Sequence, residues 1–90
     1  MSKDINYYIK TRFYFRGISD KAKLKYKLSE KCNGELYYVS MNSSLLCYLL
    51  FRLIDSKMQN KELIKRCDAL IEKTSKLLDS YNNKYPENKL

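Results

Sequence analysis

The stretch AKLKYKLSEKCNGELYYVSM, residues 22–41, predicts a β-hairpin. Its first part alternates apolar residues with lysines, which is the period of a strand with one solvated face. Asn33-Gly34 follows, and this dipeptide is a strong signal for a two-residue turn because both residues tolerate positive φ. Such a turn pairs Leu28 with Val39 and Tyr26 with Met41. All four then share one face, so the turn and the hydrophobic pattern agree.

An earlier segment has the same two-residue period. From Ile5 to Arg16, aromatic and β-branched residues alternate, which predicts a strand over 5–16 that ends at Gly17. The hairpin adds strands over 22–31 and 35–41. Because consecutive strands usually lie side by side, the three are expected to form an antiparallel meander.

Two helices are expected after the sheet. The segment 43–58 is apolar nearly all round, as in a helix that is buried on several sides. Asn60 is placed to cap a second helix over 61–81, which carries one apolar stripe. The prediction is one small α+β domain, residues 1–90, in the order β-β-β-α-α. Both helices pack on one sheet face, and residues 82–90 form a loose polar tail.

The residue types argue against catalysis and against a metal or other cofactor. The chain has no histidine, so the commonest general base is missing, and it has no glycine-rich phosphate loop. Cys32, Cys47 and Cys67 lack the spacing of a zinc site. A non-enzymatic binding protein is therefore expected.

The charge suggests a polyanionic partner. Lys and Arg number 18 against 10 Asp and Glu, a net charge of +8, although lysine-rich codon usage of an A/T-rich genome gives a similar composition. The outward face of the predicted sheet gathers cations and phenols that suit phosphates and bases: Lys10, Arg12, Tyr14, Arg16, Lys23, Lys25, Lys27 and Tyr38. The leading hypothesis is binding of nucleic acid or a nucleoprotein complex through this face. The alternative is a solvated sheet face whose lysines discourage edge pairing.

The first predicted helix suggests a protein interface. It carries Tyr48, Phe51 and Arg52, residue types that are enriched in binding hot spots, although plain core packing explains them as well. A homodimer or a complex with a host protein would use them. Small basic domains without catalytic groups also resemble, in composition, bacteriophage and mobile-element accessory proteins, which include anti-CRISPR and other anti-defence proteins. Inhibition of a host protein is therefore a second hypothesis, and sequestration of a small phosphorylated signal in a lysine- and tyrosine-lined pocket is a third.

The N-terminal residues are polar and do not resemble a signal peptide. The longest apolar stretch, Leu45 to Ile54, is interrupted by Arg52 and falls short of the roughly 20 residues that cross a bilayer. The expected location is the cytoplasm, which would be the host cytoplasm for a phage-encoded protein, with no membrane partner.

Overall fold

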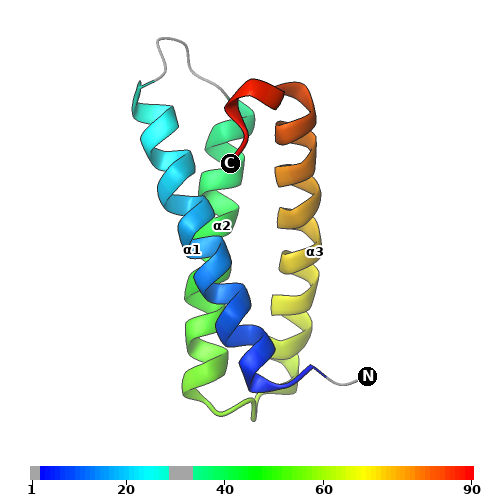
Figure 1. Cartoon of the computed structure of the whole chain (residues 1–90). Coiled ribbons are helices and arrows are strands. Elements are labelled where there is room, and N and C mark those ends of the chain that lie inside the picture. The colour runs from blue at the N-terminus through cyan, green and yellow to red at the C-terminus, as the bar shows by residue number, and fades with distance from the viewer. Residues whose placement is uncertain (1–2, 29–33) are drawn as a thin grey trace.

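Three long helices form the molecule. The computed structural model describes residues 3–28 and 34–90, and Figure 1 shows their arrangement. Helix α1 spans Ile5–Leu28, α2 spans Gly34–Asp55, α3 spans Lys61–Lys84, and a short 3-10 turn, η1, spans Pro86–Asn88. Both α1 and α3 pack against α2 in a bundle that measures 44 × 22 × 18 Å.

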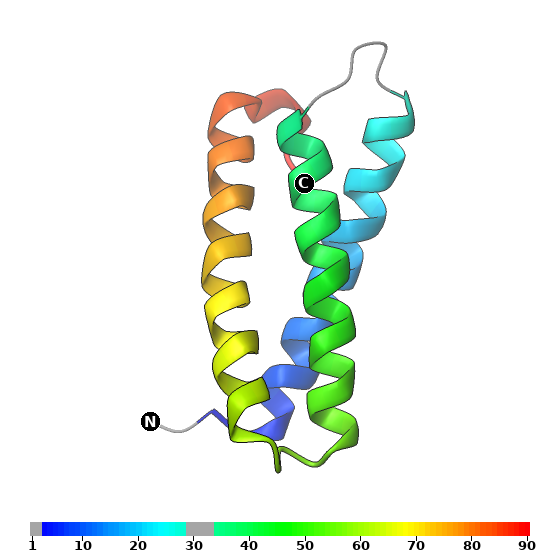
Figure 2. The ribbon, with the colours of Figure 1, turned by 180° about the vertical axis from the view of Figure 1, so that it is seen from behind.

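Helix α1 crosses α2 obliquely, while α3 runs beside α2 (Figures 1 and 2). Near the start of α1, the Tyr8 hydroxyl donates a hydrogen bond of 2.9 Å to Asp68 Oδ1 on α3. Near its end, the Tyr26 ring lies 5.9 Å from the Tyr37 ring on α2. The N-terminal half of α1 therefore reaches α3, and its C-terminal half contacts α2.

The predicted three-stranded sheet is wrong. Every described residue of the expected strands 5–16, 22–31 and 35–41 is helical, and Gly34 is the first residue of α2. Asn33, the other half of the expected turn, lies outside the described residues. The α+β class is thus replaced by an all-helical bundle in the described part of the chain.

The sequence of α1 contains a helical spacing in addition to the alternation. Tyr8, Phe15, Ile18 and Ala22 recur at intervals of seven, three and four residues, and all four are buried. The strand pattern instead placed Phe13 on the same face as Phe15, yet Phe13 is 60% exposed. Aromatic and β-branched residues favour strands only weakly, and burial of the helical stripe overrides that preference.

Side-chain caps begin two of the helices. Asp4 Oδ1 accepts a hydrogen bond of 3.0 Å from the Tyr7 amide at the start of α1, a cap that the sequence analysis missed. Asn60 Oδ1 accepts one of 3.0 Å from the Leu63 amide, so Asn60 is the cap of α3. In both helices the cap satisfies one of the amide groups that have no partner inside the helix.

The second and third helices differ in length from the expected ones. The helix expected over 43–58 begins nine residues earlier, at Gly34, and ends at Asp55, after which Lys57 and Met58 adopt positive φ in the link to α3. The helix expected over 61–81 continues to Lys84. The tail expected over 82–90 is partly ordered, because the Leu90 amide donates to Asn82 Oδ1 over 2.9 Å.

The core lies along α2. This helix contributes five fully or almost fully buried apolar side chains, which are Leu36, Val39, Leu46, Leu50 and Leu53. The stripe of α1 covers them from one side. From the other side α3 covers them with Leu63, Cys67, Leu78 and Tyr81.

Replacing Gly17 by Ala distinguishes the helix from the predicted turn. Gly17 lies in the middle of α1, and an added Cβ would meet nothing within 4 Å. Because glycine costs a helix interior about 1 kcal/mol relative to alanine, Gly17→Ala is expected to raise the free energy of unfolding by about 0.5–1 kcal/mol. Urea unfolding followed by circular dichroism measures this change. Destabilisation would contradict a continuous α1.

The contact between Tyr8 and Asp68 is expected to make stability depend on alkaline pH. Burial, and then the hydrogen bond to Asp68, raise the pKa of Tyr8 above its ordinary value of 10.0. Because the pKa is raised in the folded state, this contribution is complete below about pH 10 and is lost as the pH rises further. Tyr8→Phe should therefore lower the free energy of unfolding by about 1–2 kcal/mol at pH 7. Above pH 10 the variant should lose less stability than the unmodified protein.

Urea titrations of both proteins at several pH values test this expectation. Burial also raises the pKa of Cys67, to about 11, but Cys67 is present in both proteins, so the difference between them isolates Tyr8. Parallel pH profiles would show that the hydroxyl contributes nothing.

Candidate functional site

The predicted basic face is divided among different sides of the bundle. Successive residues of a helix turn by about 100°, so Lys10 and Arg12 point to directions roughly 160° apart rather than to one side. Lys10 and Tyr14 line a groove between α1 and α3 with a volume of about 400 Å³, and Ile71 forms part of its α3 side. Arg12 lines a different cleft, between α1 and α2.

The remaining predicted residues are also separated. Lys25 donates hydrogen bonds of 2.6 and 3.3 Å to the carbonyl oxygens of Asn88 and Lys89, so it holds the C-terminal segment against α1. Lys27 is exposed near the end of α1. Tyr38 is exposed on α2, where its ring packs edge-on to Tyr37.

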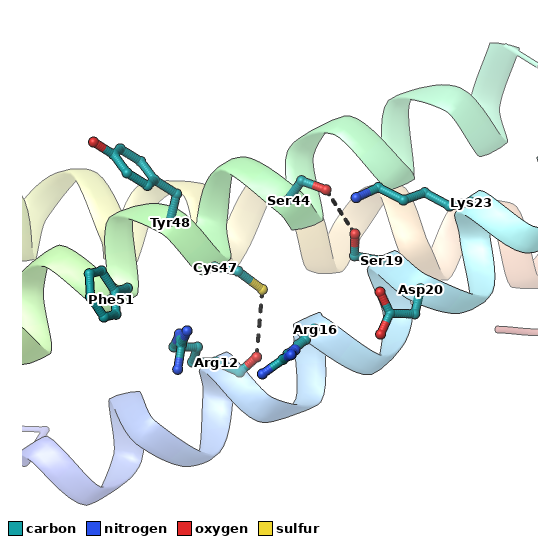
Figure 3. Close-up of a pocket in the computed structure, with 9 residues that line it drawn as sticks. All are labelled: Arg12, Arg16, Ser19, Asp20, Lys23, Ser44, Cys47, Tyr48 and Phe51. Carbon is teal, nitrogen blue, oxygen red and sulfur yellow. Dashed lines mark hydrogen bonds between the residues drawn. The ribbon is translucent and has the colours of Figure 1, made fainter.

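The structure brings together three of the predicted cations in the α1–α2 cleft, which has a volume of about 450 Å³ (Figure 3). One stripe of α1 and one of α2 form its walls, with the lining residues Arg12, Arg16, Ser19, Asp20, Lys23, Ser44, Cys47, Tyr48 and Phe51. The Ser19 and Ser44 hydroxyl oxygens lie 2.8 Å apart and join the two helices.

The cations of the cleft have no ion-pair partner among the described residues. Neither Arg12 nor Arg16 nor Lys23 forms a salt bridge in this part of the chain, and Asp20 is the only carboxylate in the lining. The Arg12 guanidinium lies 5.3 Å from the centre of the Phe51 ring, and its Nε is buried without a hydrogen-bond acceptor. The cleft is therefore positively charged, and it contains hydrogen-bond donors that have no acceptor among the described residues.

Cys47 lies within this cleft, but it is a poor nucleophile. Its thiol donates a weak hydrogen bond to the Arg12 carbonyl oxygen over 3.6 Å. Burial raises its pKa, and the nearby Arg12 and Arg16 only partly oppose that effect. Because the thiolate is the reactive form, this environment favours an inert thiol.

A row of half-exposed apolar side chains runs along α2. We call it the α2 outer face, and it consists of Tyr37, Tyr38, Met41, Leu45, Tyr48 and Phe51, each between 43% and 59% exposed. It includes two of the predicted interface residues, and the third, Arg52, lies beside them with its guanidinium 5.9 Å from the Tyr48 ring. Plain core packing, the alternative for Tyr48 and Phe51, does not fit side chains that are half exposed.

Met41 and Leu45 were missed as surface residues. Both were assigned to predicted buried elements, Met41 to the core side of the hairpin and Leu45 to the helix apolar all round. The signal that reveals them is the spacing of residues 38, 41, 45 and 48, which places one side of a helix outward once α2 is known to start at Gly34.

Basic residues border the α2 outer face on both long sides. On the α1 side lie the three cations of the cleft. On the α3 side, Arg66 and Lys73 line a groove of about 300 Å³ together with Leu45, Leu49 and Leu70. An apolar strip with cationic edges on both sides is the main feature of this surface.

Residues 3–28 and 34–90 contain no group of three or more His, Cys, Asp or Glu side chains arranged to hold a metal ion. None of the helices described is both long enough and apolar enough to cross a membrane. The comparisons with protein-family models, curated proteins and solved structures found no match to this chain.

A pair of neighbouring leucines tests the orientation of α2. Leu45 is 50% exposed, whereas Leu46 is fully buried. Leu45→Glu should change the free energy of unfolding by less than about 1 kcal/mol, while Leu46→Glu should cost about 4 kcal/mol or more, because it places a carboxylate in the core. Thermal unfolding of the two variants, which carry the same change in charge, measures the difference. Equal destabilisation would show that α2 is rotated from this position.

Proposed function

We propose that the protein binds another protein by holding an acidic amphipathic helix against the α2 outer face. The observation that carries the proposal is the row of half-exposed apolar side chains along α2, bordered by cations on both sides. A contiguous apolar patch with a polar rim is typical of an interaction site.

The composition of the face favours a protein over a nucleic acid. Tyrosine, phenylalanine and methionine are enriched in the cores of protein interfaces. Nucleic acids offer stacking partners to Tyr48 and Phe51 but little to the aliphatic side chains of Met41 and Leu45, which occupy the middle of the row. The nucleic-acid hypothesis also relied on a flat sheet that gathered eight residues, and these are now divided among several sides of the bundle.

Charge complementarity indicates an acidic partner. Arg12, Arg16 and Lys23 border the face along α1, and Arg66 and Lys73 border it along α3. A second copy of this chain docked on the same face would bring these like charges together, which is unfavourable. A partner with carboxylates beside an apolar strip would match both features.

The shape of the face suits a helix. From Tyr38 to Phe51 the row covers 13 residue steps, or about 20 Å at 1.5 Å per residue. Two shallow grooves run along its sides, one against α1 and one against α3. An amphipathic helix of about four turns fills such a surface with apolar residues at helical spacing. Occlusion of a helix of this kind is also how the inhibitor hypothesis would operate.

A designed peptide tests the proposal without a known partner. The probe is a labelled helical peptide of about 18 residues, with leucines on one face and glutamates on the flanks. The unmodified protein should bind it with a Kd in the micromolar range, and Leu45→Glu should weaken binding at least tenfold. Fluorescence anisotropy at two salt concentrations measures both, and binding should weaken at higher salt.

Two controls separate shape from net charge. A scrambled peptide of the same composition has the same charge but no apolar face and should bind at least tenfold more weakly. Leu24→Glu makes the same charge change at an exposed residue outside the α2 outer face and should bind the probe normally. Equal binding of the scrambled peptide would refute the proposal. Tight binding of labelled DNA or RNA that Leu45→Glu leaves intact would favour the nucleic-acid hypothesis instead.

A further inference from the structure

The α1–α2 cleft contains more hydrogen-bond donors than its own residues satisfy. Arg12 Nε is buried with no acceptor, and neither the guanidinium of Arg16 nor the ammonium of Lys23 has an ion-pair partner in the described chain. A ligand that supplies oxygen atoms would provide acceptors for the exposed donors of Arg16 and Lys23. The donors therefore point to an oxyanion.

The charges in the lining favour a phosphate over a carboxylate. Three cations face one carboxylate, Asp20, so the cleft retains an excess of two positive charges. A phosphate monoester carries about −1.5 to −2 at neutral pH and offers three acceptor oxygens, whereas a carboxylate carries one charge and two oxygens. The planar guanidinium groups match phosphate geometry, and lysine binds it as a point charge.

The same cleft also presents aromatic surface. In Figure 3 the Phe51 ring lies on the α2 side across from the Arg12 guanidinium on α1, while the Tyr48 ring, at the same end of the lining, points away from α1. Aromatic side chains stack on flat rings, which nucleobases offer irrespective of sequence. The cleft volume of about 450 Å³ also falls within the range of small-molecule sites.

We infer that the α1–α2 cleft binds the phosphate monoester of a small molecule that carries a flat aromatic ring, such as a nucleoside monophosphate. Arg12 and Arg16 bind the phosphate oxygens, Lys23 and the Ser19–Ser44 pair approach it from the C-terminal side of α1, and Tyr48 and Phe51 contact the ring. This inference rests on the donors and charges of the cleft and not on the proposed helix binding, although the two surfaces share Tyr48 and Phe51. It gives a location to the third hypothesis from the sequence, a small phosphorylated signal.

Titrations followed by two-dimensional ¹H–¹⁵N NMR, including the arginine Nε–H signals, test the inference. The probes are AMP, ribose 5-phosphate, inorganic phosphate and adenosine. AMP should produce saturable shifts at Arg12 Nε–H and at the amides of Ser44 and Cys47. Ribose 5-phosphate and phosphate should bind at least threefold more weakly than AMP, and adenosine at least tenfold more weakly.

Matched lysine and arginine variants locate the phosphate. Arg16→Gln and Lys23→Gln should each weaken AMP binding at least fivefold. Lys10→Gln removes the same charge from the opposite side of α1, in the groove against α3, and should leave binding unchanged. An equal loss in Lys10→Gln, or the absence of saturable shifts with any phosphate probe, would overturn the inference. Equal binding of AMP and ribose 5-phosphate would overturn the role of the aromatic ring.

A further variant keeps this inference separate from the proposed function. Leu45→Gln removes apolar contact from the α2 outer face without adding charge, and Leu45 is outside the cleft lining. It should weaken the peptide and leave AMP binding intact. Loss of both ligands in this variant would contradict the placement of the AMP site in the cleft.

Discussion

The burial of α2 determines where the other two long helices of the described chain pack. This helix is apolar around most of its circumference, and the described chain supplies only two other long helices to cover it. Helices α1 and α3 pack on two sides and bury the row from Leu36 to Leu53. A third side stays open, because two helices do not enclose a central one. The α2 outer face is therefore exposed because only two helices of the described chain cover α2. Its basic borders are the outward edges of α1 and α3.

The helical pattern was readable from the sequence only where it was unambiguous. Asn60 and the stripe that begins at Leu63 indicated α3, because a cap, a period and a polar face coincide there. The segment of α1 satisfied two periods at once. The alternation was conspicuous because many of its residues are aromatic. The helical stripe depends on only four buried side chains, which lie on both sides of Gly17 in the sequence. The strand predicted over 5–16 and the hairpin predicted around Asn33-Gly34 supported each other, since together they formed a consistent sheet.

The candidate site was predictable in its residue types but not in its arrangement. The sequence predicted that Arg12, Arg16 and Lys23 bind an anion from one face of a sheet. They do lie on one side of a single element, but that element is the helix α1. On the same helix, Lys10 lies in the groove against α3, and Lys25 holds the C-terminal segment. Ser44, Cys47 and the pairing of Phe51 with Arg12 were not accessible to a pattern argument. They depend on the angle at which α1 crosses α2, which is a property of tertiary packing.

The two proposed binding surfaces share residues, so they are not energetically separate. Tyr48 and Phe51 belong both to the α2 outer face and to the cleft, and Arg12 lies over the Phe51 ring. An acidic helix on α2 and a phosphate in the cleft would both draw on Arg12, Arg16 and Lys23. Two anions at the same cations repel one another, so each ligand is expected to weaken the other by the same factor, because coupling between sites is reciprocal.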